Sequence, residues 1–419
     1  MGFVDAGELG AEIRGDKFMN ILVFTSLYPN NMSPNLGVFI KERMTHVAQR
    51  DDCNVQVVAP VPYFPPIKIS SRYTFSQVSH EEERDGLKVS HPRYFMTPKI
   101  GMSTYGWLMY KSVLQHVIKI QKDFDFDIID AHYIYPDCYA AVLLGRYFNK
   151  PVIVSARGSD INQFAEIPAI RKKLRFTMQQ ADHNIAVCTA LKEAMVEIGA
   201  EASKVTVVPN GVDGDKFYPI DKKSAKQKIG MSGSKIILSV GQLIPRKGMD
   251  ILINSFNNLI QQTDEDVKLV IAGDGASRNE LEQLVTRLGL KDRVFLVGSH
   301  PHDELNVYYN AADLFCLASS REGWPNVVME SLATGTPVVA TNIWGTPEIL
   351  VSDDLGFLTE RNAKDMTQKL LAGIRKDWDR NKIIELMKIH TWDRAAQSVR
   401  DVCSTVLRDE VKVENSLSS

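Results

Sequence analysis

The sequence predicts an α/β protein built of two doubly wound domains. Short apolar runs alternate with amphipathic stretches along almost the whole chain, which is the pattern of right-handed βαβ units with parallel strands. The runs are continuously apolar, as at 235–240 (KIILSV), and this is typical of strands covered by helices on both faces of a sheet. A polar, Lys-rich stretch at 221–235 divides the alternation into two series.

The first series predicts six strands, at 21–25, 55–60, 128–131, 151–155, 184–187 and 205–208, and helices over 36–50, 103–121 and 136–148. The segment 61–102 differs, because it is rich in proline and aromatic residues and contains the acidic run Glu81–Glu83. We predict that this segment is a long insertion and that the acidic run is a solvated loop.

The second series predicts five strands, at 235–240, 267–272, 294–297, 313–318 and 337–340, and helices over 249–260 and 277–288. A further helix is expected after 319–324, because Pro325 suits a first helical turn. The segment 391–408 predicts an amphipathic helix.

The length and the break between the series define the predicted domains. A chain of 419 residues has room for two or three domains of roughly 150 residues each. We place the domains at 19–215 and 216–390, with the boundary near 212–220. Residues 1–18 lack the cationic and apolar regions of a signal peptide, and we expect them to be an extension that precedes the fold.

The composition excludes several classes of protein. With 44% hydrophobic and 24% charged residues, the chain is neither disordered nor fibrous. A net charge of −2 gives no basic excess for nucleic acid, and no apolar run is long enough for a transmembrane helix. The 5 cysteines form no CxxC pair, so we expect no zinc site, no disulfide framework and a cytoplasmic location.

Two loops of the second series predict an anion site. The first predicted strand leads into Gly241 and then Arg246-Lys247 before a helix, and a helix N-terminus favours negative charge. A guanidinium fork beside an ammonium suits a diphosphate, although a solvated basic turn would look the same. After the next strand, Gly273-Asp274 permits a tight turn and a close backbone approach.

The corresponding loop of the first series has no GxGxxG fingerprint, which disfavours a nicotinamide or flavin cofactor there. Gly37 lies where a helix is expected to begin. It would let a ligand approach backbone N–H groups, and a plain loop glycine is the equal alternative.

The strongest pattern is the run from Glu322 to Glu330. Glu322 precedes a predicted helix and Glu330 lies about two turns further on, so the carboxylates are about 12 Å apart. They are too far apart to share one proton or one metal, but they can contact separate parts of one extended ligand. A glutamate commonly holds the vicinal diol of a ribose, and Gly323 leaves backbone N–H groups open to hydroxyls. The alternative is two acids on a helix surface.

In this context, Glu322-x7-Glu330 resembles the signature of glycosyltransferase family 4, the retaining GT-B transferases. Further stretches agree with this resemblance: 208–213 with Phe217, 241–248, 273–275, 311–314 and, more loosely, 130–132 and 151–155. The likeness extends from Met19 over nearly the whole chain. It implies two Rossmann-like domains facing each other across a cleft that narrows on binding, with the helix over 391–410 returning to the N-terminal domain.

The resemblance also implies roles for residues. The N-terminal domain would bind the acceptor and the C-terminal domain the donor. Arg246, Lys247 and Glu322 would be catalytic, and Glu330 would hold the ribose. Side chains would replace a metal, so that no cofactor is expected. The implied donor-binding residues are Gly37, Arg157, Gly241, Arg246, Lys247, Gly273, Asp274, Gly323, Trp324, Pro325, Asn326, Val327 and Glu330.

Two basic features leave alternatives open. Arg157 stands where many members of the family carry a histidine; it cannot be a general base, and it would pair with Asp160 or bind an anionic group. The predicted helix with Arg171, Lys172, Lys173 and Arg175 would meet an anionic membrane surface or acceptor, or simply be solvated.

The predicted function is the transfer of a sugar, with retention, from a nucleotide-diphosphate sugar to a carbohydrate or lipid-linked acceptor. UDP is the expected nucleotide. The protein would be cytoplasmic or peripheral on the inner face of the membrane. A sugar-nucleotide epimerase of the same architecture and a non-catalytic nucleotide-sugar binding protein are the alternatives.

Overall fold

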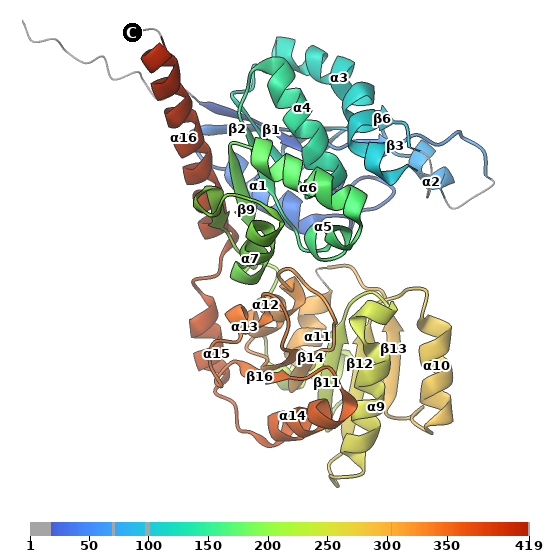
Figure 1. Cartoon of the computed structure of the whole chain (residues 1–419). Helices are drawn as coiled ribbons and strands as arrows, with labels where there is room; N and C mark the ends of the chain where they lie inside the picture. Colours follow the sequence, from blue (N-terminus) through green and yellow to red (C-terminus); the bar gives the residue numbers. More distant parts are fainter. Residues whose placement is uncertain (1–17, 69–71, 97–100, 303, 418–419) are drawn as a thin grey trace, which may run out of the picture.

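The computed structural model describes residues 18–417 apart from 69–71, 97–100 and 303. It is an α/β protein with two large sheets, each carrying its own helices (Figure 1). The predicted fold class is therefore confirmed. The predicted extension lies outside the described residues, except for Phe18.

The first sheet has the strand order β10-β9-β8-β7-β1-β2-β5-β4. Its strands are β1 (Met19–Phe24), β2 (Cys53–Val58), β4 (Glu81–Arg84), β5 (Leu87–Ser90), β7 (Ile128–His132), β8 (Val152–Ser155), β9 (His183–Ala186) and β10 (Val205–Val207). A small sheet pairs β3 (Val61–Pro62) with β6 (Arg93–Tyr94). The helices of this half are α1 (Val38–Ala48), α2 (Tyr73–Ser76), α3 (Tyr105–Asp123), α4 (Tyr139–Phe148), α5 (Ser159–Asn162), α6 (Pro168–Gln180) and α7 (Thr189–Ile198).

The second sheet has the order β13-β12-β11-β14-β15-β16, and all its pairs are parallel. Its strands are β11 (Lys235–Val240), β12 (Val267–Ala272), β13 (Val294–Gly298), β14 (Leu314–Leu317), β15 (Val338–Thr341) and β16 (Gly356–Thr359). The helices are α8 (Lys222–Lys228), α9 (Met249–Ile260), α10 (Arg278–Arg287), α11 (Leu305–Ala311), α12 (Asn326–Ala333), α13 (Thr346–Ile349), α14 (Ala363–Arg375) and α15 (Arg380–Met387).

Both sheets reverse their strand order at one place, between β1 and β7 in the first and between β11 and β14 in the second. In open parallel sheets ligands bind outside the carboxyl ends of the strands at such a switch point. The loops after β11 and β14 carry the predicted residues Arg246, Lys247 and Glu322. The topology therefore places these three residues at the edge where a ligand is expected.

The acidic run at Glu81–Glu83 is not a solvated loop, as the sequence predicted, but part of the edge strand β4. β4 pairs antiparallel with β5 through a turn at Asp85-Gly86. Both turn residues have positive φ, 49° and 79°, as a two-residue hairpin turn requires. Glu82 is held by Arg84 at 2.9 Å and by His91 at 2.7 Å. Charged side chains suit an edge strand because they discourage pairing with other chains.

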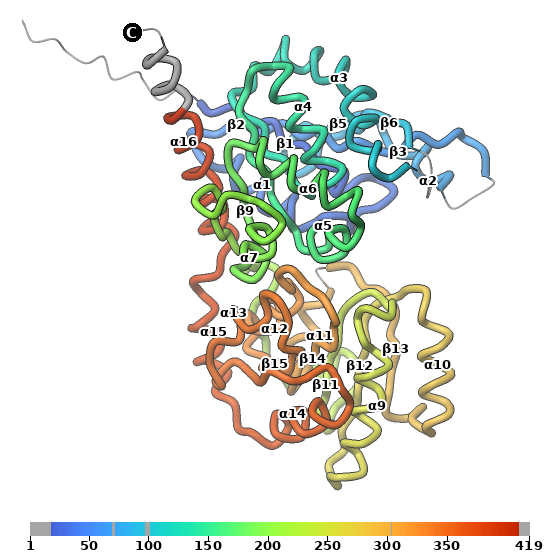
Figure 2. Tube along the Cα trace, viewed as in Figure 1, coloured from blue at the N-terminus to red at the C-terminus, as the bar shows by residue number. Residues whose placement is uncertain are grey.

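The last helix, α16 (Trp392–Leu417), belongs to the first half of the molecule. It packs against α1, and its apolar face completes the core beside β1 and β2. In Figure 2 its red trace lies beside the blue start of the chain. The chain thus crosses between the two halves twice, once after β10 and once before α16.

The two crossings lie side by side. The N–H of Val212 donates to the carbonyl of His390 at 2.9 Å. A Cβ on Gly211 would lie 2.2 Å from the backbone nitrogen of Trp392, so only glycine fits there. None of the helices in the part of the chain described here is long and apolar enough to span a membrane.

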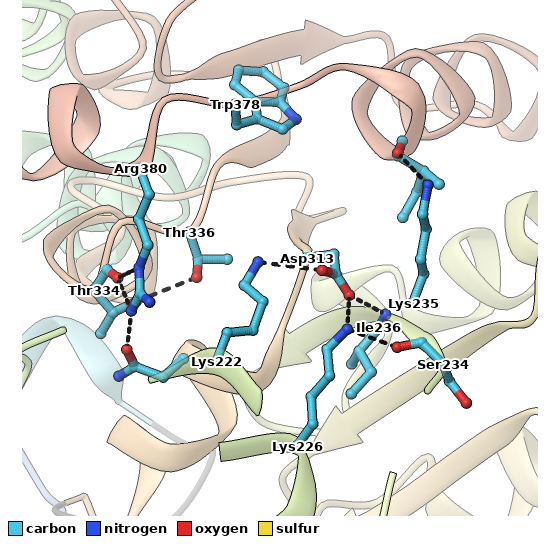
Figure 3. A network of polar contacts seen from close by, with 12 residues as sticks. Lys222, Lys226, Ser234, Lys235, Ile236, Asp313, Thr334, Thr336, Trp378 and Arg380 are labelled. Carbon is cyan, nitrogen blue, oxygen red and sulfur yellow. Dashed lines mark hydrogen bonds and ion pairs between the residues drawn. The ribbon is translucent and has the colours of Figure 1, made fainter. Parts of the chain in front are cut away.

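The polar stretch after the first crossing contains α8, which a charged network binds to the second sheet (Figure 3). Lys222 and Lys226 reach the carboxylate of Asp313 at 3.2 and 2.6 Å. That carboxylate also accepts the N–H of Ile236 on β11 at 2.8 Å. Close by, Arg380 of α15 donates to the carbonyl of Thr334 at the end of α12, and also to the carbonyl of Ile220 and the side chain of Asn310.

We expect Arg380→Ala to destabilise the second half of the molecule. The loss leaves several acceptors without their donor, which corresponds to about 2 kcal/mol and, at this domain size, to a thermal midpoint lower by about 5 °C. Arg375→Ala is the matched control, because that exposed side chain makes one bond, to the carbonyl of Gln262. Calorimetry measures both variants, and equal shifts would contradict the role given to Arg380.

Candidate functional site

The loops at the carboxyl ends of the two sheets touch backbone to backbone. A Cβ on Gly323 would lie 2.4 Å from the carbonyl oxygen of Arg157, and one on Gly158 would lie 2.8 Å from the Cα of Gly323. A side chain at either position would therefore push the loops apart. Glycine at this contact is what lets the loop after β8 meet the loop after β14.

Ion pairs and helix caps join the halves around this contact. Arg321 donates to the carbonyl of Asn162 at 2.9 Å and to the carboxylate of Glu166 at 2.8 Å. The carboxylate of Glu348 accepts the N–H of Thr189 at 2.9 Å and that of Ala190 at 3.1 Å, at the N-terminus of α7. A negative charge is favourable at a helix N-terminus. These contacts join the two halves on both sides of the backbone contact.

The three residues predicted to be catalytic form one cluster. The Nζ atom of Lys247 lies 2.6 Å from Oε1 of Glu322, and Nη1 of Arg246 lies 3.6 Å from Oε2. Ser319 donates its hydroxyl to Oε1 at 2.7 Å. Both cations come from the short 3-10 turn Pro245–Lys247 after β11, and Glu322 comes from the loop after β14. A carboxylate between two cations orders them for an anionic ligand.

Glycines let the surrounding loops pack. A Cβ on Gly248 would lie 2.2 Å from the carbonyl of Ala318, and one on Gly273 would lie 1.9 Å from that of Gly241. Gly37 begins α1 with φ 64°, and a Cβ there would lie 2.0 Å from the carbonyl of Leu27. These contacts explain the glycines structurally, and their part in ligand binding stays a prediction.

Asp274 is exposed at the tip of the loop after β12. Its carboxylate accepts the N–H of Gly275 at 2.7 Å and lies 3.4 Å from Nη1 of Arg278. Its contact with a donor stays a prediction.

The second predicted carboxylate, Glu330, is buried on α12. Oε2 accepts a hydrogen bond from the hydroxyl of Tyr309 at 2.7 Å, and Oε1 accepts one from Nε2 of His302 at 3.0 Å. The rings of His302 and Tyr309 both make T-shaped contacts with the ring of Phe217, with centroid distances of 4.8 and 5.7 Å. The sequence did not single out His302 or Tyr309, because an isolated histidine in a polar loop and a tyrosine on a helix carry no spacing signal.

Glu330 lines a cavity of about 100 Å³ between the two halves. Its walls come from α1, both crossings, the loop before α11 and the start of α12. They are formed by Asn35, Val38, Phe39, Glu42, Gly211, Val212, Asp213, Phe217, His302, Asn326, Glu330 and Trp392.

The residues between the two carboxylates lie in different environments. Trp324 is buried against Gly345. Pro325 precedes α12 instead of occupying its first turn, because the helix begins at Asn326. The side chain of Asn326 accepts a bond from Asn210 across the two halves at 3.1 Å, and Val327 is half-buried beside it.

Arg157 points into a buried polar cluster behind the cavity. Its Nη2 donates to Nδ1 of His132 at 2.6 Å, and its guanidinium lies over the ring of Phe39, a cavity wall. Its expected pairing with Asp160 occurs only through the Arg157 backbone N–H, at 3.0 Å. The side-chain ion pair that the sequence suggested is thus replaced by contacts to His132 and to Asn210.

Burial dominates the electrostatics of this cluster. It raises the pKa of Asp130 to about 6 and lowers that of Arg157 to about 10, while it holds the pKa of His132 well below its usual range. His132 is therefore neutral, and its Nδ1 accepts a hydrogen bond from the guanidinium of Arg157. Fully buried Arg43 donates to the side chain of Asn210 at 2.9 Å, so the cluster fixes the amide that bonds to Asn326.

The predicted basic helix is α6, and its cations are largely used within the chain. Lys173 lies 4.8 Å above the ring of Tyr139, and Arg175 donates to the carbonyl of Ile198 at 2.8 Å. Arg171 lies 3.7 Å from Glu197, and Lys172 is exposed. The contact of this helix with an anionic surface or acceptor stays a prediction. In the described ranges no group of three or more His, Cys, Asp or Glu side chains is arranged to hold a metal ion.

The contact at Gly323 gives a direct test of how the halves meet. We expect Gly323→Ala to separate them, because the added methyl would meet backbone rather than a movable side chain. Gly214→Ala is the matched control, since a Cβ there has no atom within 4 Å. Small-angle scattering should show a larger radius of gyration only for Gly323→Ala. An unchanged radius would mean that the loops are apart in solution.

The comparisons with known proteins agree with this architecture. The model described as "Glycosyltransferase Family 4" matches residues 44–216, and the model described as "Glycosyl transferases group 1" matches residues 221–388. TuaC of Bacillus subtilis, assigned as a teichuronic acid biosynthesis glycosyltransferase, is 28% identical over 366 residues, which is 84% of this chain and 88% of TuaC.

Solved structures show the same fold. Sucrose-phosphate synthase from Thermosynechococcus elongatus has a TM-score of 0.73 at 16% identity, covering 94% of this chain and 100% of its own. Anabaena HepE in complex with UDP and glucose has a TM-score of 0.62 at 20% identity, covering 95% and 100%. The paired sheets, the two matched family models and the relatives together identify the chain as a glycosyltransferase of family 4 with the GT-B fold.

Proposed function

We propose that this glycosyltransferase moves a sugar, with retention of configuration, from a nucleotide-diphosphate sugar to a carbohydrate or lipid-linked acceptor in glycan or glycolipid biosynthesis. The observation that carries the proposal is the cluster of Arg246, Lys247 and Glu322 at the switch point of the second sheet. Two cations and one carboxylate leave a net positive charge at the place where a diphosphate would enter.

The diphosphate would take over the two cations from Glu322. Lys247 acts as a point charge and Arg246 as a fork, and both are already held at the strand ends. When the bond from the sugar to the diphosphate breaks, negative charge grows on the leaving oxygen. Cations fixed in advance stabilise that charge in the transition state more than in the ground state.

Glu322 would then turn to the donor sugar. Once the diphosphate neutralises Lys247, the carboxylate can accept bonds from sugar hydroxyls. The N–H groups of Gly323, Trp324, Asn326 and Val327 follow it in the loop and first turn of α12 and would be further donors. Glu322 is thus a positioning group for the reacting sugar. Retention is proposed from the family resemblance.

Glu330 would hold the ribose of the nucleotide. It is a buried carboxylate in the cavity wall, and it lies on α12, the helix that follows the loop of Glu322. A vicinal diol would present two donors to it. HepE, with the same fold, is described in complex with UDP and glucose, which supports UDP as the nucleotide. The acceptor would enter from the first sheet, whose loops face this site.

Glu330 and Glu322 should affect different steps. We expect Glu330→Gln to weaken the binding of UDP by about tenfold or more, because a bond to a charged acceptor contributes about 1.5–3 kcal/mol. We expect Glu322→Gln to lower turnover by about 100-fold. UDP should bind this variant as well as the wild type or better, because the carboxylate of Glu322 no longer competes with the diphosphate for Lys247. Isothermal calorimetry and a nucleotide-release assay measure the two effects.

The thermal midpoint of each variant serves as the folding control for this pair. If both variants lost the same affinity for UDP, the division between ribose and sugar carboxylates would be wrong. If neither lost affinity nor turnover, the site itself would be misplaced.

Metal independence is proposed from the same cation pair. Arg246 and Lys247 supply the positive charge that a divalent ion would otherwise bring to the diphosphate. We expect turnover to persist within about twofold in excess EDTA, since the residual change reflects only ionic strength. Loss of turnover that Mg²⁺ or Mn²⁺ restores would overturn this part of the proposal.

A further inference from the structure

The carboxylate of Glu330 already has two donors in this structure. Tyr309 donates to Oε2 at 2.7 Å and His302 donates to Oε1 at 3.0 Å. A carboxylate has about four acceptor positions, so a ribose diol that Glu330 holds, as proposed above, would bind the same oxygens that these two donors already contact. The inference below rests on that proposed role.

The two donors differ in how firmly they are held. Tyr309 is fully buried on α11 and its ring packs against Phe217 and Phe315. His302 precedes α11 in a loop, and its side chain is 34% exposed. Its ring makes a T-shaped contact with Phe217, with 4.8 Å between the ring centroids. His302 can therefore rotate away from Glu330 without opening the core, whereas Tyr309 cannot.

The size of the cavity shows that something must move. Its volume of about 100 Å³ holds only a few water molecules, whereas ligand sites generally measure about 300–1,000 Å³. His302 and Glu330 both line it. A diol that reaches Oε1 from this cavity therefore meets the imidazole of His302, which would have to turn aside to make room.

We propose that the nucleoside of the donor displaces His302 from its hydrogen bond with Oε1 of Glu330, and that protonation of His302 weakens donor binding. A histidinium paired with Glu330 is harder to displace than a neutral imidazole, because an ion pair must be broken instead of one hydrogen bond. The histidine thereby sets the pH range in which the donor binds.

The charged groups around His302 fix the direction of this effect. Burial lowers the pKa of His302, and the hydrogen bond and charge of Glu330 raise it; Lys216 lowers it and Glu42 raises it slightly. The result lies above the ordinary value. Lys216 is itself paired with Glu42 and Asp213, both at 2.8 Å, so Glu330 is the anion left to face the imidazole.

The sign of the pH dependence follows. His302 binds its proton more tightly when it is paired with Glu330 than when it is displaced into water. Donor binding therefore releases protons, and affinity falls as the pH drops through the raised pKa of the free enzyme. Below the ordinary pKa of a displaced histidine, about 6.5, the affinity becomes constant again.

The test is the pH profile of nucleotide-sugar affinity from pH 8 to pH 5.5, measured by calorimetry. UDP-glucose, ADP-glucose and GDP-mannose are titrated in parallel, because all three present the same ribose and none has a terminal phosphate that titrates in this range. The wild-type enzyme should bind at least about threefold more weakly at pH 5.5 than at pH 8.

Three variants separate the possible outcomes. His302→Gln should bind equally well at both pH values, since an amide donor does not titrate, and His302→Ala should bind more tightly than the wild type at pH 5.5. His300→Gln is the matched control, because His300 lies in the same loop but pairs with Glu304 and Tyr308. It should keep the wild-type slope.

Failure of this inference is distinguishable from failure of the proposed function. If Glu330→Gln binds the nucleotide sugar as well as the wild type, or if none of the three probes binds, the ribose role of Glu330 is wrong. If Glu330→Gln binds the nucleotide sugar weakly but His302→Gln keeps the wild-type dependence of affinity on pH, the proposed displacement of His302 is wrong. If His302→Gln and His302→Ala lose affinity at every pH with unchanged thermal midpoints, His302 contacts the ligand instead of being displaced by it.

Discussion

The structure depends on one constraint, the close approach of loop backbones at the carboxyl ends of the strands. Gly248 lies against Ala318, and this contact sets the cation turn beside the loop that carries Glu322. Gly323 lies against Arg157, and this contact joins the two halves at the same place. Because the contacts are between backbones, a side chain at either glycine would push the loops apart. The charged cluster of Arg246, Lys247 and Glu322 therefore depends on these glycines as well as on its own attraction.

A second level of organisation is the polar cluster under the cavity. Arg43 and Asp130 are fully buried, Arg157 lies beside them at the edge of the cluster, and neutral His132 lies among them. Such a cluster is favourable only while its members satisfy one another. Asn210 connects this cluster to the other half of the molecule. Its side-chain oxygen accepts hydrogen bonds from both arginines, and its amide nitrogen donates to Asn326. The buried charges thus control the orientation of the residue that begins α12.

The sequence was informative where its signals are local. The alternation of apolar runs predicted the strands of both sheets except β4, β5 and β16. The spacing from Glu322 to Glu330 predicted a loop acid and a helix acid. The prediction was wrong at β4, because a run of acids gives no apolar alternation. The sequence signal of this hairpin is the Asp85-Gly86 turn. The sequence missed His302 because its meaning comes from Glu330, 28 residues away, and from the tertiary fold alone.

The return of α16 to the first half has a consequence for how the protein is made. The face of β1, β2 and α1 that α16 covers is apolar, and α16 is synthesised only after the whole second half of the molecule. At synthesis rates of about 5–20 residues per second, the residues between the two crossings take on the order of ten to forty seconds to appear. During this interval the second sheet folds while the first remains uncovered. The nascent chain therefore exposes this apolar surface until α16 has been synthesised.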